Sequence, residues 1–251
     1  MTDEIDFHEP GDGRRIAFRH HPGEGEGAAR PTLVFLPGYM SDMAGGKATA
    51  IHGWAVARGQ PCLLLDYSGC GRSTGDFAQG TLSRWREEVL SLVEAQVAGA
   101  VVLIGSSMGG WLMLLAGEAL GSRLAGMVGI AAAPDFSDWG YDDDQKARLA
   151  AGHTVFEDNP YGPEPTPTHP GFWQDAQRQR LLSREIAIDC PVRLLHGQAD
   201  PDVPWETSLR TAAALRSDDV QVTFVKDGDH RLSREQDIAL LLRTLAALPI
   251  P

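Results

Sequence analysis

Short apolar runs alternate with longer amphipathic segments along most of this chain of 251 residues. The runs are rich in Val, Leu and Ile, lack polar alternation, and occupy residues 32–36, 62–66, 100–105, 127–131, 192–196 and 220–225. Runs of this kind are typical of strands that are buried on both faces, as in a parallel sheet. Their alternation with helical segments predicts an α/β fold with a mostly parallel central sheet, flanking helices and right-handed crossovers.

The segments between the runs have helical periodicity. Residues 81–96 place their apolar side chains on one face and charged side chains on the other, and either Thr81 or Ser83 could cap the helix. Residues 204–215 and 234–248 show similar patterns. We expect helices in all three segments.

Two segments depart from this alternation. Residues 5–9 and 14–20 flank a Pro-Gly turn and predict an antiparallel hairpin at the sheet edge. Residues 135–185 form a connection that is too long for a simple crossover. Its Pro-rich stretch, residues 158–170, excludes regular helix or a central strand. We expect one domain over residues 1–251, with residues 135–185 forming a short helical cap on the end of the sheet.

Composition excludes several classes of protein. The chain has 22 Lys and Arg against 34 Asp and Glu, a formal net charge of −12, which argues against a nucleic-acid partner. No apolar run approaches the roughly 18 residues of a membrane span. The first residues resemble neither a secretory signal nor a transit peptide, and no C-x-x-C pair occurs among Cys62, Cys70 and Cys190. We therefore expect a cytoplasmic protein without disulfides, in which Cys70 is a buried thiol rather than a redox group.

The strongest chemical signal is the motif Gly105-Ser106-Ser107-Met108-Gly109. It matches G-x-S-x-G, follows an apolar strand and precedes an apolar helix, which is the setting of a nucleophile elbow. The sharp turn lifts the central hydroxyl out of the sheet, so Ser107 is the candidate nucleophile. The alternative is a Gly/Ser-rich turn of a nucleotide-binding unit, but the chain lacks the G-x-G-x-x-G pattern.

A serine nucleophile needs a base, and that base needs an orienting carboxylate. His230 follows the last strand in a polar loop and is the candidate base, whereas we expect His196, at the end of a buried strand, to be structural. Asp200 and Asp202 compete for the role of acid. Asp200 is favoured because it follows the preceding strand closely, whereas Asp202 is better suited to capping the next helix. The chain order is then Ser, Asp, His.

An oxyanion hole requires two backbone N–H groups directed at one point. The N–H of Met108 follows the nucleophile, and the N–H of Tyr39 follows Gly38 in the loop after the strand 32–36. That loop could also be a plain connection with Ser41 as an N-cap. Apolar side chains that could line an acyl pocket, or simply fill the core, are those of Tyr39, Met40, Trp111, Trp139 and Trp173.

Taken together, these motifs resemble the α/β-hydrolase superfamily. The matching segments occur in the family's order: Pro37-Gly38, residues 66–73, residues 105–109, Gly197-x-x-Asp200 and Asp229-His230. Longer strings, such as residues 36–43 and 105–114, resemble a mitochondrial palmitoyl-protein thioesterase branch that is also known for acyl-glucuronide esterase activity. The resemblance implies Ser107, Asp200 and His230 as the triad. The chain departs from that branch in lacking a mitochondrial presequence and in its insertion.

These observations predict a serine hydrolase that cleaves carboxylic esters or thioesters through an acyl-enzyme. Its substrate would be a small acyl ester or thioester or an acylated protein, and we expect neither a cofactor nor a metal because no metal-ligand spacing occurs. Three alternatives remain. The same triad could serve a peptidase or lipase, it could serve a cofactorless haloperoxidase or C–C hydrolase, or the fold could be kept by a non-catalytic binding protein.

Overall fold

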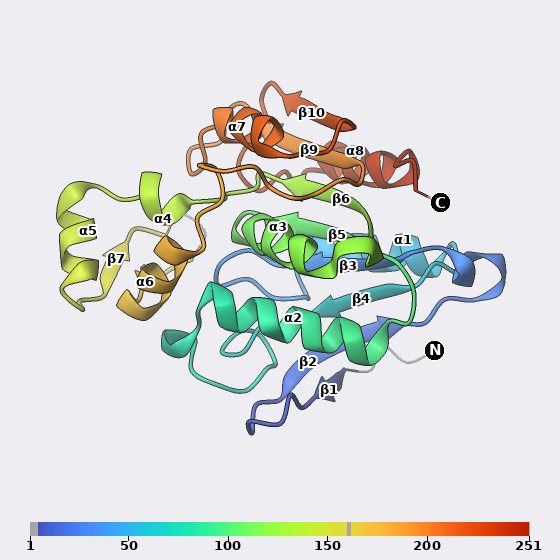
Figure 1. The fold of residues 1–251 in the computed structure, drawn as a ribbon, viewed down its shortest axis with the longest axis horizontal. Helices are drawn as coiled ribbons and strands as arrows, with labels where there is room; N and C mark the ends of the chain where they lie inside the picture. Colours follow the sequence, from blue (N-terminus) through green and yellow to red (C-terminus); the bar gives the residue numbers. More distant parts are fainter. Residues whose placement is uncertain (1–4, 160–161, 251) are drawn as a thin grey trace.

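The computed structural model describes residues 5–159 and 162–250, and its centre is an eight-stranded sheet of order β1-β2-β4-β3-β5-β6-β9-β10 (Figure 1). The strands are β1 (Asp6–His8), β2 (Ile16–His21), β3 (Thr32–Leu36), β4 (Cys62–Leu65), β5 (Val101–Ser106), β6 (Leu124–Ile130), β9 (Val192–Gly197) and β10 (Val220–Val225). From β4 to β10 all neighbours are parallel, and only β1 and β2 add antiparallel pairs. The predicted α/β architecture and edge hairpin are therefore confirmed.

Helices cover both faces of this sheet (Figure 1). Along β5, Val101 and Leu103 pack in one core cluster with α2 and α3, while Val102 and Ile104 pack in a second cluster with α1 and α8. A strand between two apolar layers needs no polar alternation, which explains the continuous apolar runs. The helices around the sheet are α1 (Gly46–Val56), α2 (Leu82–Gln96), α3 (Met108–Leu120), α7 (Glu206–Ala214) and α8 (Glu235–Ala246), with short 3-10 turns η1 (Gly25–Ala29), η2 (Phe77–Gln79) and η3 (Gly121–Arg123).

Two local expectations are resolved by the structure. Helix α2 is capped by Thr81, whose side chain accepts a hydrogen bond from the Arg84 N–H at 3.1 Å, rather than by Ser83. The expectation that β10 is buried on both faces is wrong. Its residues alternate between exposed and half-buried positions at its start because it is an edge strand with β9 as its partner.

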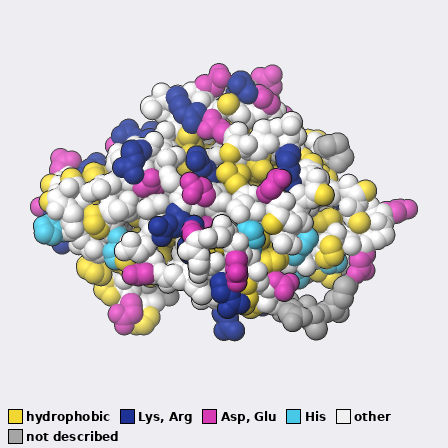
Figure 2. Space-filling model, turned by 60° about the horizontal axis from the view of Figure 1, so that its bottom comes forward, with side chains coloured by type: hydrophobic (Ala, Val, Ile, Leu, Met, Phe, Trp, Pro, Cys, Tyr) yellow, Lys and Arg dark blue, Asp and Glu magenta, His cyan; other side chains and the backbone are white. Residues whose placement is uncertain are grey.

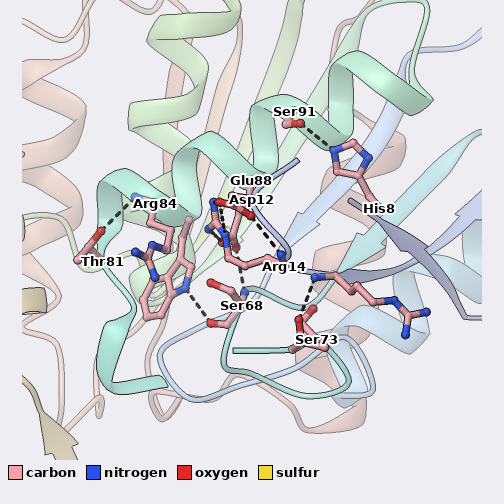
Figure 3. Close-up of polar contacts among 12 residues, drawn as sticks. His8, Asp12, Arg14, Ser68, Ser73, Thr81, Arg84, Glu88 and Ser91 are labelled. Carbon is pink, nitrogen blue, oxygen red and sulfur yellow. Dashed lines mark hydrogen bonds and ion pairs between the residues drawn. The ribbon is translucent and has the colours of Figure 1, made fainter. Parts of the chain in front are cut away.

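The hairpin β1–β2 is joined to helix α2 by partly buried polar contacts (Figure 3). Arg14 pairs with both Asp12 and Glu88, and the second carboxylate oxygen of Glu88 accepts the backbone N–H of Ser68 at 2.9 Å. Glu88 is 1% exposed, and burial raises its pKa although these donors oppose that shift. One carboxylate therefore joins the edge hairpin, helix α2 and the loop after β4.

The insertion (residues 135–185) contains α4 (Phe136–Trp139), α5 (Asp143–Ala150), β7 (Val155–Glu157), β8 (Thr166–Thr168) and α6 (Pro170–Arg178). These elements lie together to one side of the main sheet (Figure 1). The insertion is not purely helical as expected, because β7 and β8 pair as a separate antiparallel hairpin. Pro167 fits there because a two-stranded sheet leaves one side of each strand unpaired. Part of the Pro-rich stretch, residues 160–161, lies outside the described residues.

Asp135 joins the two ends of the insertion. Its backbone is left-handed, with φ of 60°, and its side chain is buried. The carboxylate accepts the backbone N–H groups of Leu181 at 2.7 Å and Leu182 at 2.9 Å. The point where the chain leaves β6 is thus bonded to the segment that returns toward β9.

Candidate active site

Ser107 lies at the turn between β5 and α3 with φ of 55° and ψ of −122°. A non-glycine residue in this region is strained and persists only where surrounding structure imposes it. The flanking glycines allow the close packing around this turn, because a Cβ on Gly105 would lie 2.3 Å from the Gly109 carbonyl oxygen. A Cβ on Gly109 would lie 2.1 Å from the Leu36 carbonyl oxygen. The G-x-S-x-G spacing therefore reflects tight packing of α3 against β5 and the loop after β3.

The structure brings the three candidate triad side chains together. His230 Nε2 lies 3.0 Å from Ser107 Oγ, and His230 Nδ1 lies 2.8 Å from Asp200 Oδ2. The loops after β9 and β10 carry Asp200 and His230, and the Ala199 N–H donates to the Gly228 carbonyl at 3.0 Å. Gly197 permits this approach, since a Cβ there would lie 2.2 Å from the Gly228 oxygen.

Asp200, rather than Asp202, is placed to orient the imidazole. Its side chain is 0% exposed, and its Oδ1 accepts the backbone N–H groups of Asp202 at 2.8 Å and Val203 at 2.9 Å. Burial alone would raise the pKa of Asp200, but hydrogen bonds from His196 and His230 hold that pKa well below its ordinary value. Asp200 is thus an anion at neutral pH, suited to stabilising a charged His230.

The same residues are the candidates for metal binding. Ligand atoms of Asp200, Asp202 and His230 lie within 4.8 Å of one another. Two backbone N–H groups and two imidazoles already face the Asp200 oxygens, which uses the roughly four lone-pair positions of a carboxylate. The donor set therefore fits a hydrogen-bonded acid better than a metal ligand.

The loop after β3 lies beside the serine. A Cβ on Gly38 would lie 3.4 Å from both the Ser107 Cβ and the Ser106 carbonyl oxygen. Tyr39 and Met108, the two proposed oxyanion donors, follow Gly38 and Ser107 directly in sequence. Their service as oxyanion donors remains a prediction.

His196 makes contacts that the sequence did not indicate. It is fully buried, and its Nε2 lies 3.1 Å from the Val203 carbonyl oxygen and 3.3 Å from Asp200 Oδ2. Its Nδ1 lies 2.7 Å from Ser208 Oγ. The four-residue spacing between His196 and Asp200, spanning a strand end and a tight turn, was the available signal.

An aromatic cluster (Tyr39, Phe77, Trp85, Trp111, Phe136 and Phe172) joins the loop after β3 to the insertion. The Tyr39 ring lies 5.0 Å from Phe77 and 4.9 Å from Phe172 between centroids, and its hydroxyl donates to the Pro167 carbonyl at 2.9 Å. Phe136 and Phe172 stack at 5.7 Å, and Phe136 meets Trp111 edge-on at 5.6 Å. Neither Phe136 nor Phe172 was among the predicted pocket residues.

The predicted pocket residues lie in different surroundings. Met40 is 47% exposed, whereas Trp111 is fully buried and donates to the Gln179 carbonyl at 3.1 Å. Trp139 donates to the Pro134 carbonyl and Trp173 to the Ser137 carbonyl, each at 2.9 Å. Trp173 also lines a groove of about 630 Å³ on the insertion, with side chains of α5 and α6. Contact of any of them with an acyl group remains a prediction.

Comparison with known proteins identifies the family of this chain. A model of the alpha/beta hydrolase family matches residues 33–244. The chain belongs to the α/β hydrolase family. Mouse palmitoyl-protein thioesterase ABHD10, named as mitochondrial, is 39% identical over 220 residues, which cover 86% of this chain and 74% of the relative. The predicted family resemblance is confirmed, and this α/β hydrolase is an enzyme of the hydrolase class.

Two solved structures extend the likeness over nearly the whole chain. The putative hydrolase from Agrobacterium vitis S4 has a TM-score of 0.89 and 38% identity, and the match covers 98% of this chain and 99% of that one. Mouse alpha/beta hydrolase domain-containing protein 10 has a TM-score of 0.89 and 33% identity, with 98% of each chain covered. The match therefore includes the insertion of this α/β hydrolase as well as its sheet.

The surface of this α/β hydrolase is mixed in charge. On the face shown in Figure 2, Lys and Arg side chains are interspersed with Asp and Glu rather than gathered into one basic surface.

Within residues 5–159 and 162–250, no helix combines the length and the apolar character that crossing a bilayer requires. The expectations of a cytoplasmic location and of no nucleic-acid partner stay predictions.

Proposed function

We propose that this α/β hydrolase cleaves carboxylic esters or thioesters by two-step acyl transfer through Ser107. The observation that carries the proposal is the unbroken chain of hydrogen bonds from Ser107 through His230 to Asp200, with separations of 3.0 and 2.8 Å. A serine hydroxyl is a weak nucleophile on its own, and this arrangement supplies the base and its orienting anion.

In the first step, His230 Nε2 takes the hydroxyl proton while Ser107 Oγ attacks the substrate carbonyl carbon. The carbonyl oxygen becomes an oxyanion between the N–H groups of Tyr39 and Met108, where each donor contributes about 3 kcal/mol to the barrier reduction. His230 then gives its proton to the departing alcohol or thiol. A water molecule, deprotonated by His230, then attacks the acyl-enzyme carbonyl, and His230 returns that proton to Ser107 Oγ as the acid is released.

The surroundings of the site support an apolar acyl group. The aromatic cluster begins at Tyr39, whose backbone N–H is one of the proposed oxyanion donors, and reaches Phe136 and Phe172 of the insertion. ABHD10, the relative described above, is named as a palmitoyl-protein thioesterase. A long-chain thioester, on a small molecule or an acylated protein, is therefore the substrate class we propose, with the insertion acting as a cap that selects the acyl group.

The test combines covalent labelling with a substrate panel. A fluorophosphonate should label the wild type and Ser106→Ala but not Ser107→Ala, because the two serines are neighbours and only Ser107 contacts His230. The panel contains p-nitrophenyl esters from acetyl to palmitoyl, acyl-coenzyme A thioesters and peptide amides.

We expect turnover of esters and thioesters that is lost in Ser107→Ala. Retained turnover in that variant contradicts the mechanism, and preferential cleavage of amides favours a peptidase. A wild-type protein that neither labels nor turns over any substrate would be a binding protein that keeps the fold.

A further inference from the structure

We propose that His196 and Ser208 form a buried pair that positions Asp200, and so act on the proposed reaction from behind the triad. The inference rests on the proposed function, since it concerns how Asp200 serves His230. It starts from the shared Asp200 Oδ2, which lies 2.8 Å from His230 Nδ1 and 3.3 Å from His196 Nε2. The carboxylate is thus held between two imidazoles, of which only His230 contacts the nucleophile.

The hydrogen bonds of His196 define its protonation pattern. Its Nε2 faces the Val203 carbonyl at 3.1 Å and the Asp200 carboxylate, and both of these groups can only accept. Nε2 therefore carries a proton. Nδ1 lies 2.7 Å from the Ser208 hydroxyl, which can donate to a neutral imidazole. Ser208, on helix α7, thereby fixes the tautomer that directs an N–H toward Asp200 and Val203.

This N–H also stabilises the loop that holds the other carboxylate oxygen. Asp200 Oδ1 accepts the N–H groups of Asp202 and Val203, and the carbonyl of that same Val203 accepts from His196. His196, Ser208 and Val203 are each 3% exposed or less. Water therefore has little access to replace the imidazole, so its removal loosens both the loop and the Asp200 carboxylate.

A loosened Asp200 has a specific consequence for His230. The carboxylate stabilises the charged imidazole, so weaker contact makes His230 harder to protonate and moves the acid limb of the pH–rate profile to lower pH. The same loss reduces kcat, because the imidazolium forms in the transition state. KM changes little, since neither His196 nor Ser208 faces the acyl group in the proposed arrangement.

The experiment uses steady-state kinetics across pH, with kcat counted per site labelled by fluorophosphonate. His196→Met removes the N–H at similar volume, His196→Gln keeps a donor near the Nε2 position, and Ser208→Ala removes only the hydroxyl. Thr211→Val is the matched control. Thr211 is fully buried on the same helix, and its hydroxyl donates to the Thr207 carbonyl rather than to His196.

We expect His196→Met to lower kcat about tenfold or more, as does the loss of residues that hydrogen-bond a catalytic or metal-binding side chain in other enzymes. KM should stay within about twofold of the wild type. The acid limb of the pH–rate profile should lie about half a pH unit lower. His196→Gln should recover most of the loss, and Ser208→Ala should lose about threefold. Thr211→Val should match the wild type.

The inference is overturned if both His196→Met and Ser208→Ala keep the wild-type kcat per labelled site and the wild-type acid limb of the pH–rate profile. If His196→Met does not fold, Ser208→Ala decides alone. Failure of the proposed function would be observed in a different way. A wild-type protein that is not labelled by the fluorophosphonate and hydrolyses no substrate would contradict both the proposed function and the role of His196 and Ser208.

Discussion

Replacing Asp200 by Asn should move the proton of the neutral His230 imidazole from Nδ1 to Nε2. The backbone N–H groups of Asp202 and Val203 lie 2.8 and 2.9 Å from Oδ1, which favours the amide oxygen of the new side chain in that position. The His196 N–H keeps the Val203 carbonyl as its acceptor. The amide NH₂ then takes the Oδ2 position, 2.8 Å from His230 Nδ1. A donor there forces Nδ1 to accept, which leaves the proton on Nε2.

An Nε2 that already carries a proton cannot take one from Ser107, although the two atoms stay about 3.0 Å apart. The wrong tautomer costs about 10⁴ in kcat in a serine protease with the same triad, or about 5 kcal/mol of transition-state stabilisation. We expect a loss of that order for Asp200→Asn, measured as initial rates on a saturating p-nitrophenyl ester. Thermal unfolding should show that the variant is folded.

Asp202→Asn is the control for this substitution. It alters the neighbouring acid, whose backbone N–H, rather than its carboxylate, bonds Asp200. Its kcat should stay within about threefold of the wild type, as expected for an exposed charge. If Asp200→Asn kept more than about a tenth of wild-type kcat, the assignment of Asp200 as the orienting acid would be refuted.

Two further predictions concern stability and thiol chemistry. Asp135→Ala removes two charge-assisted hydrogen bonds to Leu181 and Leu182 and should lower the free energy of unfolding by about 3 kcal/mol in urea titrations, whereas an unchanged midpoint contradicts the bridging role of Asp135. Burial raises the pKa of Cys62 and Cys70 to about 12 and that of Cys190 to about 11, so the native thiolates form only as the pH approaches those values. A disulfide reagent at pH 8 should therefore label native protein far more slowly than protein in urea, and fast native labelling of Cys70 would contradict its burial.

Much of the sheet could be predicted because each strand carries its signal locally. Residues 32–36 and 220–225 were predicted with the bounds of β3 and β10, since apolar runs and flanking turn residues are properties of short segments. The exposure of β10 could not be read in the same way, because burial of an edge strand depends on which strands pair. The pairing of β7 with β8 was missed for a related reason, as three-residue strands around a proline carry almost no periodic signal.

The residues of the candidate site also differ in whether local sequence or tertiary packing determines their contacts. Ser107, Asp200 and His230 could be selected because each follows a strand at its carboxyl end, where parallel topology gathers loops. The pairing of Ser208 with His196 could not be predicted, because that hydrogen bond depends on how helix α7 packs behind the loop, and only His196 reaches Asp200. Phe136 and Phe172 were likewise missed, since nothing in the spacing of the insertion reveals which aromatic side chains turn toward Tyr39.

Tyr39 connects the acyl chain-length preference of the enzyme with its turnover rate. Its backbone belongs to the loop beside Ser107, while its phenol ring and hydroxyl are anchored in the insertion through Phe172 and Pro167. Any exchange of the insertion for one from another hydrolase would remove these anchors and shift the peptide group next to the reacting serine. Chimeras made to change chain-length preference should therefore also change turnover rate, unless the residues that hold the tyrosine are transplanted with it.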